Sequence, residues 1–161
     1  MTLSKVTPDA QIFTFEASTK FEIKLTDLTD LLITAGQGCY FWGRVFVNID
    51  TKKPFKDQDL KLEREGGIII NTNNLNLDSN LFCLDYQCYE IEDKSEIEIH
   101  KDKTIKDFIN SIKLIIEHPN TKASLRNSII DSLASKDYGY LDALDMDYIM
   151  QKCIFGKLVY G

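Results

Sequence analysis

The sequence predicts a single α+β domain, in which an antiparallel sheet comes from the N-terminal two-thirds and about three helices from the C-terminal third. Two observations predict this fold class. Apolar and polar residues alternate through much of residues 1–100, which is typical of half-buried strands. After His100 the apolar residues recur at helical spacing. Because strands come first and helices follow, we expect the helices to pack on one face of the sheet, within one domain of residues 1–161 that is strand-rich over 1–100 and helix-rich over 101–161.

The first strands are predicted from alternation close to the N-terminus. Residues 21–25 alternate cleanly, and Phe13 and Phe15 continue the same period upstream, so the two segments are expected to form a hairpin. Residues 27–34 fit either an irregular segment or a short helix capped by Asp27. The glycines of residues 36–38 are expected to break the chain after it.

The most aromatic stretch, residues 39–49, predicts a long central strand, with Gly43 as a bulge or a point of close approach. A further strand is predicted at 67–71, before an asparagine-rich segment that favours turns. Residues 81–91 and 96–99 are predicted to form a hairpin that turns at 93–95, with Glu96 and Glu98 on its outward face.

Three helices are predicted in the C-terminal third. The first begins near Ile105, where Thr104 and Asp107 have the spacing of a capping box, and it ends before Pro119. A second helix is predicted from about Thr121, and a third over residues 141–153. Residues 158–160 are expected to form a short final strand.

Acidic residues gather in two segments that are the best candidates for a binding surface. Residues 85–98 hold six carboxylates and one lysine, and residues 137–147 hold four carboxylates and no base, interleaved with tyrosines. Carboxylates steer a basic partner and tyrosines supply rigid contact area, although charges on an exposed strand also prevent edge-to-edge aggregation. The candidate partner-binding residues are Asp85, Glu90, Glu92, Asp93, Glu96, Glu98, Asp137, Tyr138, Tyr140, Asp142, Asp145 and Asp147.

Composition narrows the classes of partner. The net charge is −6 and no basic stripe is present, so direct binding of nucleic acid, which needs clustered Lys and Arg, is not expected. No segment approaches the ~20 apolar residues of a membrane span, and the first residues lack the apolar run of a signal peptide. The four cysteines have neither disulfide nor zinc-site spacing. We therefore expect a cytoplasmic protein with reduced thiols and no membrane partner.

Catalytic and metal-binding patterns are weak. His118 is expected to cap the first helix and His100 to lie at the surface, while Cys39 lacks the cationic neighbours that would activate a thiol. Two Asp-x-Asp units, at 57–59 and 145–147, do not fit the calcium-loop pattern. We expect no catalytic residue, no metal and no cofactor, and hence not an enzyme.

In size, acidity and composition the whole chain resembles bacterial toxin-immunity proteins, including those of contact-dependent inhibition systems. The resemblance implies a small inhibitor that occludes a basic cognate toxin domain, often a nuclease. Two alternatives remain open. One is an enzyme or small-ligand-binding protein with a pocket around residues 36–44, where Cys39, Arg44 and a histidine would converge. The other is a phage-encoded acidic inhibitor of a host nuclease.

Overall fold

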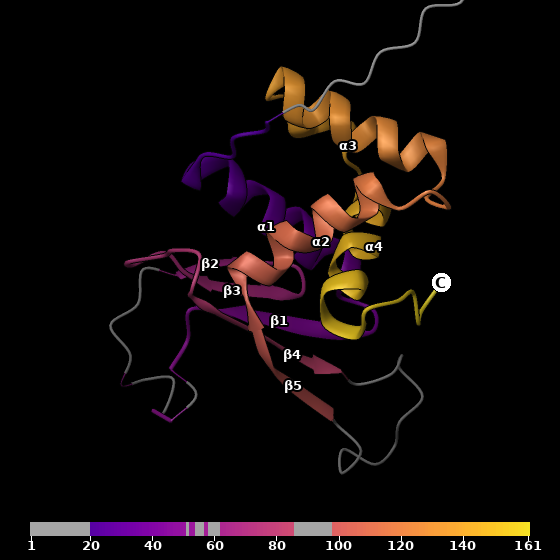
Figure 1. The fold of residues 1–161 in the computed structure, drawn as a ribbon. Helices are drawn as coiled ribbons and strands as arrows, with labels where there is room; N and C mark the ends of the chain where they lie inside the picture. Colours follow the sequence, from indigo (N-terminus) through magenta and orange to yellow (C-terminus); the bar gives the residue numbers. More distant parts are fainter. Residues whose placement is uncertain (1–19, 51, 54–56, 58–61, 86–97) are drawn as a thin grey trace, which may run out of the picture.

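The computed structural model describes residues 20–50, 52–53, 57, 62–85 and 98–161. Within them, five strands form one sheet in the order β2-β3-β1-β4-β5, and the helices lie above one face of this sheet (Figure 1). This confirms the predicted α+β class. The strands are β1 (Gly43–Val47), β2 (Leu62–Glu65), β3 (Ile68–Asn71), β4 (Asn80–Asp85) and β5 (Glu98–Thr104). The helices are α1 (Leu25–Cys39), α2 (Ile105–Glu117), α3 (Ala123–Ser135), the 3-10 helix η4 (Tyr138–Tyr140) and α4 (Ala143–Phe155).

The sheet is mixed, so the prediction of a purely antiparallel sheet is only partly right. β1 pairs in parallel with β3, and the other neighbouring strands are antiparallel. β2 and β3 form a hairpin through a tight turn in which Gly66 has a φ of +53°. The hairpin joins the sheet through its second strand, which places β3 rather than β2 beside β1. Alternation of side chains cannot predict this choice of neighbour.

The strand predicted at residues 21–25 is wrong. Residues 20–24 belong to no strand, and α1 begins at Leu25 and runs through Gly36 and Gly38, which were expected to break the chain. Residues 13–15 lie outside the described part of the chain. The buried positions of α1 recur at helical spacing, which the short ambiguous stretch at 27–34 only hinted at. They are Leu28, Leu31, Leu32, Ala35 and Cys39.

Both helical glycines of α1 lie where backbones approach closely. A Cβ at position 36 would overlap the side chain of Ile68 in β3, and one at position 38 would overlap the carbonyl oxygen of Ala143 in α4. Glycine is unfavourable inside a helix by roughly 1 kcal/mol relative to alanine. Here its missing side chain is what lets α1 lie against β3 on one side and α4 on the other.

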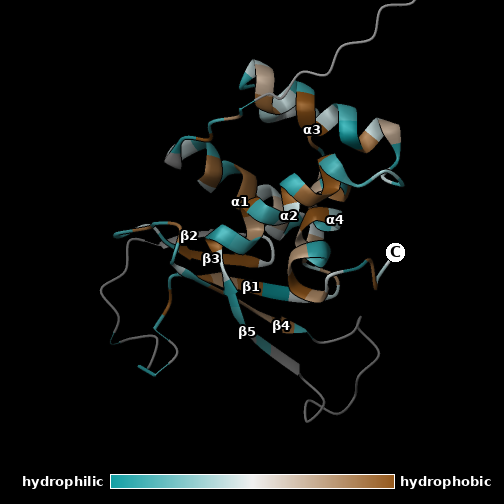
Figure 2. Ribbon diagram, viewed as in Figure 1, coloured by the Kyte–Doolittle hydropathy of each residue, from teal (hydrophilic) through white to brown (hydrophobic). Residues whose placement is uncertain are grey.

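The predicted central strand is confirmed, although it is shorter than expected. β1 occupies the middle of the sheet, and Val45 and Val47 face the helices and are buried. Phe46 points to the opposite face, where its ring stacks on that of Phe82 with centroids 4.8 Å apart. Figure 2 shows the hydrophobic residues concentrated between the sheet and the helices. Gly43 is a point of close approach, since a Cβ there would lie 2.9 Å from the Cys83 sulfur.

β4 and β5 are antiparallel neighbours, as the predicted hairpin requires. β5 extends to Thr104, beyond the predicted end at residue 99, and α2 follows it directly. The predicted turn at 93–95 and Glu96 lie outside the described residues, as does the side chain of Glu98. Residues 158–160 do not form the expected strand.

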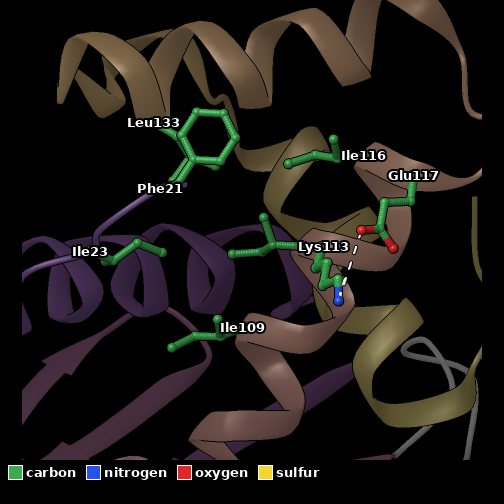
Figure 3. Close-up of a pocket in the computed structure, with 8 residues that line it drawn as sticks. Phe21, Ile23, Ile109, Lys113, Ile116, Glu117 and Leu133 are labelled. Atoms are coloured by element: carbon green, nitrogen blue, oxygen red, sulfur yellow. Dashed lines mark ion pairs between the residues drawn. The ribbon is translucent and has the colours of Figure 1, made fainter. Parts of the chain in front are cut away.

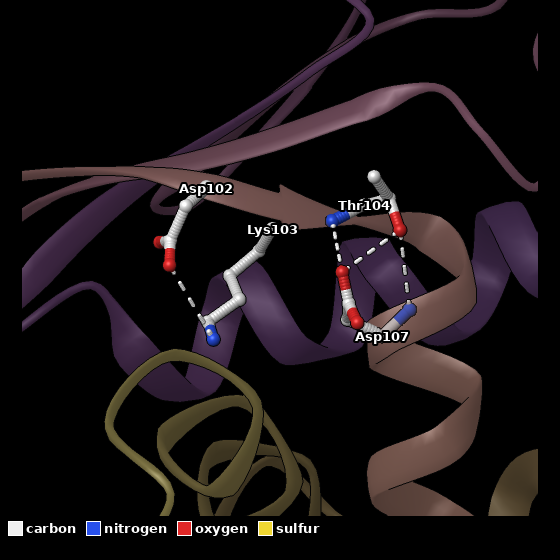
Figure 4. A network of polar contacts seen from close by, with 4 residues as sticks. All are labelled: Asp102, Lys103, Thr104 and Asp107. Atoms are coloured by element: carbon white, nitrogen blue, oxygen red, sulfur yellow. Dashed lines mark hydrogen bonds and ion pairs between the residues drawn. The ribbon is translucent and has the colours of Figure 1, made fainter.

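The start of α2 confirms the predicted capping box (Figure 4). The Thr104 hydroxyl accepts a hydrogen bond from the backbone N–H of Asp107, and the Asp107 carboxylate accepts one from the backbone N–H of Thr104 at 2.8 Å. Two of the unpaired N–H groups of the first turn are thereby satisfied. The helix ends at His118, which is its C-cap residue as predicted.

Candidate functional site

Most of the second acidic segment comes together at the corner between η4 and α4. Asp137 accepts a hydrogen bond from the Gly139 N–H at 3.1 Å and caps η4. Asp142 accepts one from the Asp145 N–H at 2.8 Å and caps α4. Aspartate is among the preferred N-cap residues because its carboxylate satisfies an orphan N–H and favours the positive end of the helix dipole. The local sequence therefore places these carboxylates at the corner.

Large apolar side chains stand out from the same corner. Leu144 is 73% exposed and Tyr140 is 61% exposed, although both are of a type that usually contributes to a core. Asp137 and Asp142 are exposed around them, and Asp145 is half-buried. We call these five residues the corner surface.

The electrostatics of the corner surface are one-sided. Burial raises the pKa of Asp145, and the neighbouring Asp142 carboxylate raises it further. No ion pair joins Asp137, Asp142 or Asp145 to a basic side chain in the described part of the chain. An incoming cation would relieve the repulsion between the two acids, so the corner surface favours a basic partner.

Two predicted members of the site lie elsewhere. Tyr138 is half-buried, and burial together with the negative charge of Asp27 raises its pKa. Asp147 is only 5% exposed, and its carboxylate accepts hydrogen bonds from the Trp42 indole at 2.6 Å and from the Gln151 amide at 2.7 Å. Two residues of α4 differ in direction by about 200°, so Asp145 faces the corner and Asp147 faces the core.

The first acidic segment is described only at its ends. Asp85 is 6% exposed, and both of its carboxylate oxygens accept hydrogen bonds from the Tyr160 hydroxyl, at 2.7 and 2.9 Å. Asp85 therefore does not belong to an acidic surface as predicted, because its carboxylate is bound inside the protein. Outside the described residues lie Glu90, Glu92, Asp93 and Glu96, and with them the side chain of Glu98.

A buried polar cluster links segments that are far apart in the chain, and sequence reasoning missed it. Asp147 joins Trp42 to Gln151, while Asp85 joins Tyr160 to His100, whose Nε2 lies 3.8 Å from the Asp85 carboxylate. His100, in β5, is half-buried with its ring edge-on to Phe155 rather than at the surface as predicted. The partners are far apart in sequence, so no local motif could have indicated this cluster.

The predicted pocket around residues 36–44 is not formed in the expected way. Cys39 is buried under the helices, whereas Arg44 is exposed on the helix-free face of the sheet. Gly36 is packed against β3. Cys39 and Arg44 therefore do not converge with a histidine.

An apolar cavity of about 440 Å³ lies instead between α2, α3 and the segment that leads into α1 (Figure 3). An ion pair between Lys113 and Glu117, with 3.8 Å between nitrogen and oxygen, lies at its rim. The apolar lining residues are Phe21, Ile23, Ile109, Ile112, Ile116 and Leu133.

The described cysteines are expected to be slow nucleophiles in the folded protein. Burial raises the pKa of Cys39 and of Cys153 to about 12, and it raises the pKa of Cys83 further. Because the thiolate is the reactive form, alkylation of these three thiols at neutral pH should be far slower than that of a free thiol, and should become fast only on unfolding. Mass mapping after timed alkylation measures this, and fast reaction of any of the three in the folded state would contradict it. Cys88 lies outside the described residues, and its alkylation rate is measured separately.

No protein-family model matches the chain, and no curated protein and no solved structure matches it. Among the described residues, no helix is long and apolar enough to cross a membrane. The same residues contain no cluster of three His, Cys, Asp or Glu side chains that could hold a metal ion. The site is therefore interpreted from its geometry alone.

Proposed function

We propose that the protein is a small inhibitor of the immunity-protein type, which acts in the cytoplasm and occludes a basic toxin domain through the corner surface. The observation that carries this proposal is the exposure of Leu144 and Tyr140 among carboxylates that have no basic partner in the described part of the chain. Apolar anchors surrounded by charge are the ordinary composition of a protein interface.

The physical basis is complementarity of charge and shape. A Lys or Arg of the partner would lie between Asp142 and Asp145, where the Asp142 carboxylate helps to raise the pKa of Asp145. Contact with Leu144 would exclude water and strengthen that ion pair. A nuclease toxin fits this surface, because a site that holds phosphate is itself basic. An inhibitor of this kind needs no catalysis of its own.

Removal of the corner charges tests the proposal. The double variant Asp142→Asn, Asp145→Asn should bind the cognate toxin domain at least about tenfold more weakly, because losing one partner of an interfacial charge pair costs ~2–5 kcal/mol. Asparagine also caps helices well, so the fold should be retained. Titration calorimetry at low and moderate salt measures the affinity, with a basic nuclease toxin domain as the titrant.

Two matched variants serve as controls. Asp131→Asn removes one exposed charge from α3, away from the corner surface, and should leave affinity nearly unchanged. Leu144→Ala keeps every charge and should weaken binding with little change in its salt dependence. Equal affinities for wild type and the double variant, with the same salt slope, would contradict the proposal. Binding to a host nuclease instead would favour the phage-inhibitor alternative.

A second candidate function, binding of a small apolar ligand, is favoured by the cavity between α2 and α3. Its lining is aliphatic and aromatic, as in many ligand sites. The substitution Ile116→Trp places a larger side chain in the cavity and changes no residue of the corner surface. Saturable binding of an apolar fluorescent probe that Ile116→Trp abolishes, together with unchanged toxin binding in the double variant, would favour this second function.

A further inference from the structure

The segment that follows α4 returns to the sheet and closes over the one tryptophan of the chain. α4 ends at Gly156, which has a φ of +72° and open space around its Cα. Residues 157–161 then run along the end of the sheet without joining a helix or strand. We call these five residues the strap.

One aromatic side chain anchors the strap. The Tyr160 ring stacks on Trp42, with centroids 5.3 Å apart and planes at 10°, and it meets Phe155 edge-on at 5.9 Å. Its hydroxyl donates to the Asp85 carboxylate at 2.7 Å. Aromatic faces hold the ring, and a buried carboxylate recognises the phenol as a hydrogen-bond donor.

One amide side chain binds the strap backbone. The Gln151 Oε1 atom accepts hydrogen bonds from the N–H groups of Val159 at 2.8 Å and Tyr160 at 2.7 Å, and its Nε2 atom donates to the Tyr160 carbonyl at 3.0 Å. Two consecutive N–H groups that converge on one acceptor atom recognise a turned backbone, irrespective of the neighbouring side chains. Ring and backbone contacts together define a site for a tyrosine within a short turned peptide.

Two of the groups that contact the strap are held in place by a third. Asp147 accepts hydrogen bonds from both Trp42 and Gln151 and thereby fixes them. The strap itself leaves Leu158 50% and Val159 47% exposed, and it follows the C-cap glycine of α4.

We propose that Trp42, Asp85, Gln151 and Phe155 form a binding site for a tyrosine residue of a short turned peptide, which the strap fills in this structure and can vacate. A partner segment carrying an unmodified tyrosine would compete with the strap for the same contacts. Phosphotyrosine would be rejected, because its charge would face the Asp85 carboxylate. This site is separate from the corner surface and does not depend on the proposed function.

The test uses the full chain with Tyr160→Ala, which removes the side chain that fills the site and leaves only the strap backbone on Gln151. Trp42 is the one tryptophan, so its fluorescence reports directly on the site. The peptide Lys-Leu-Val-Tyr-Gly, blocked at both ends, should bind saturably and return the emission toward that of wild type. A peptide with phenylalanine in place of tyrosine should bind roughly tenfold or more weakly, because it lacks the hydrogen bond to a charged acceptor. The phosphotyrosine peptide should not bind.

Two results would overturn the proposal: no response of the folded variant at about 1 mM peptide, or equal affinity for the tyrosine and phenylalanine peptides. If the variant does not fold, amide hydrogen exchange of the wild-type chain decides. Release of the strap predicts that the Val159 and Tyr160 amides exchange through a local opening, at rates that do not depend on low denaturant. Exchange of these amides only through global unfolding, with the denaturant dependence of the β1 amides, would also overturn it.

Discussion

Replacing Trp42 with alanine is expected to lower the free energy of unfolding by about 3–5 kcal/mol, the largest effect of any single substitution considered. The side chain is fully buried between Phe155 and Tyr160, so its removal leaves a cavity in the core. Its loss also removes one of the two donors that stabilise the buried Asp147 carboxylate. Unfolding in urea, followed by circular dichroism because the tryptophan is gone, measures the change.

Trp42→Phe separates packing from hydrogen bonding. Burial raises the pKa of Asp147, and the bonds from Trp42 and Gln151 lower it in part. The folded protein therefore loses stability as the pH rises from below the unfolded pKa of about 3.9 to above the raised folded value. Without the indole donor the pKa of Asp147 rises further, so the variant should lose more over the same range.

The difference in stability between wild type and Trp42→Phe should therefore be larger at neutral pH than below about pH 4. The nearby Cys39 thiol, with a pKa of about 12, stays neutral throughout and does not contribute. The same difference at both pH values would show that the Trp42–Asp147 hydrogen bond does not favour the ionised carboxylate.

Gly38→Ala is expected to destabilise the fold by about 2–3 kcal/mol, against the usual helix preference for alanine. The added Cβ would overlap the carbonyl oxygen of Ala143 and lie 3.0 Å from the Cβ of Asp147. The first of these neighbours is backbone, so no side-chain rotation can relieve the contact. α4 would have to move away from α1, opening the most extensive contact between two helices.

The exposed neighbour Gln37 provides the matched control. Gln37→Ala also places alanine in the same turn, with a smaller gain in helix preference, and should alter stability by only about 0.5 kcal/mol. Denaturation midpoints of the two variants measure the comparison. A Gly38→Ala protein as stable as wild type would show that α1 and α4 are not held at this distance.

The sequence alone was enough to predict an element where the signals for it lie within that element. α2 has both a helical apolar period and the capping box of Thr104 and Asp107, and the two signals agree. β1 and β4 alternate as predicted because one face of each is buried under helices and the other is not. The carboxylates of the corner surface were found for the same reason, since Asp137 and Asp142 cap their helices through neighbours in the chain.

Packing and strand pairing between segments far apart in the chain depend on the tertiary structure and could not be predicted from the sequence. Residues 21–25 alternate like a strand, but residues 20–24 belong to no strand and Leu25 begins α1, whose apolar stripe is buried against the sheet and α4. Gly36 and Gly38 were expected to interrupt the chain, but they lie within α1 at points where it packs closely on β3 and α4. The parallel pairing of β1 with β3 follows from where the β2–β3 hairpin docks.

The acidic residues also show which properties depend on the sequence and which depend on the fold. Counting acids predicted a surface at Asp85 and Asp147, yet each carboxylate has hydrogen-bond donors contributed from distant parts of the chain, Tyr160 for the first and Trp42 for the second. A sequence fixes how many charges a segment has and which of them can cap a helix. Whether a carboxylate faces water or a buried donor depends on which distant side chain the fold brings to it, because burial of a charge is tolerated only where such a partner exists.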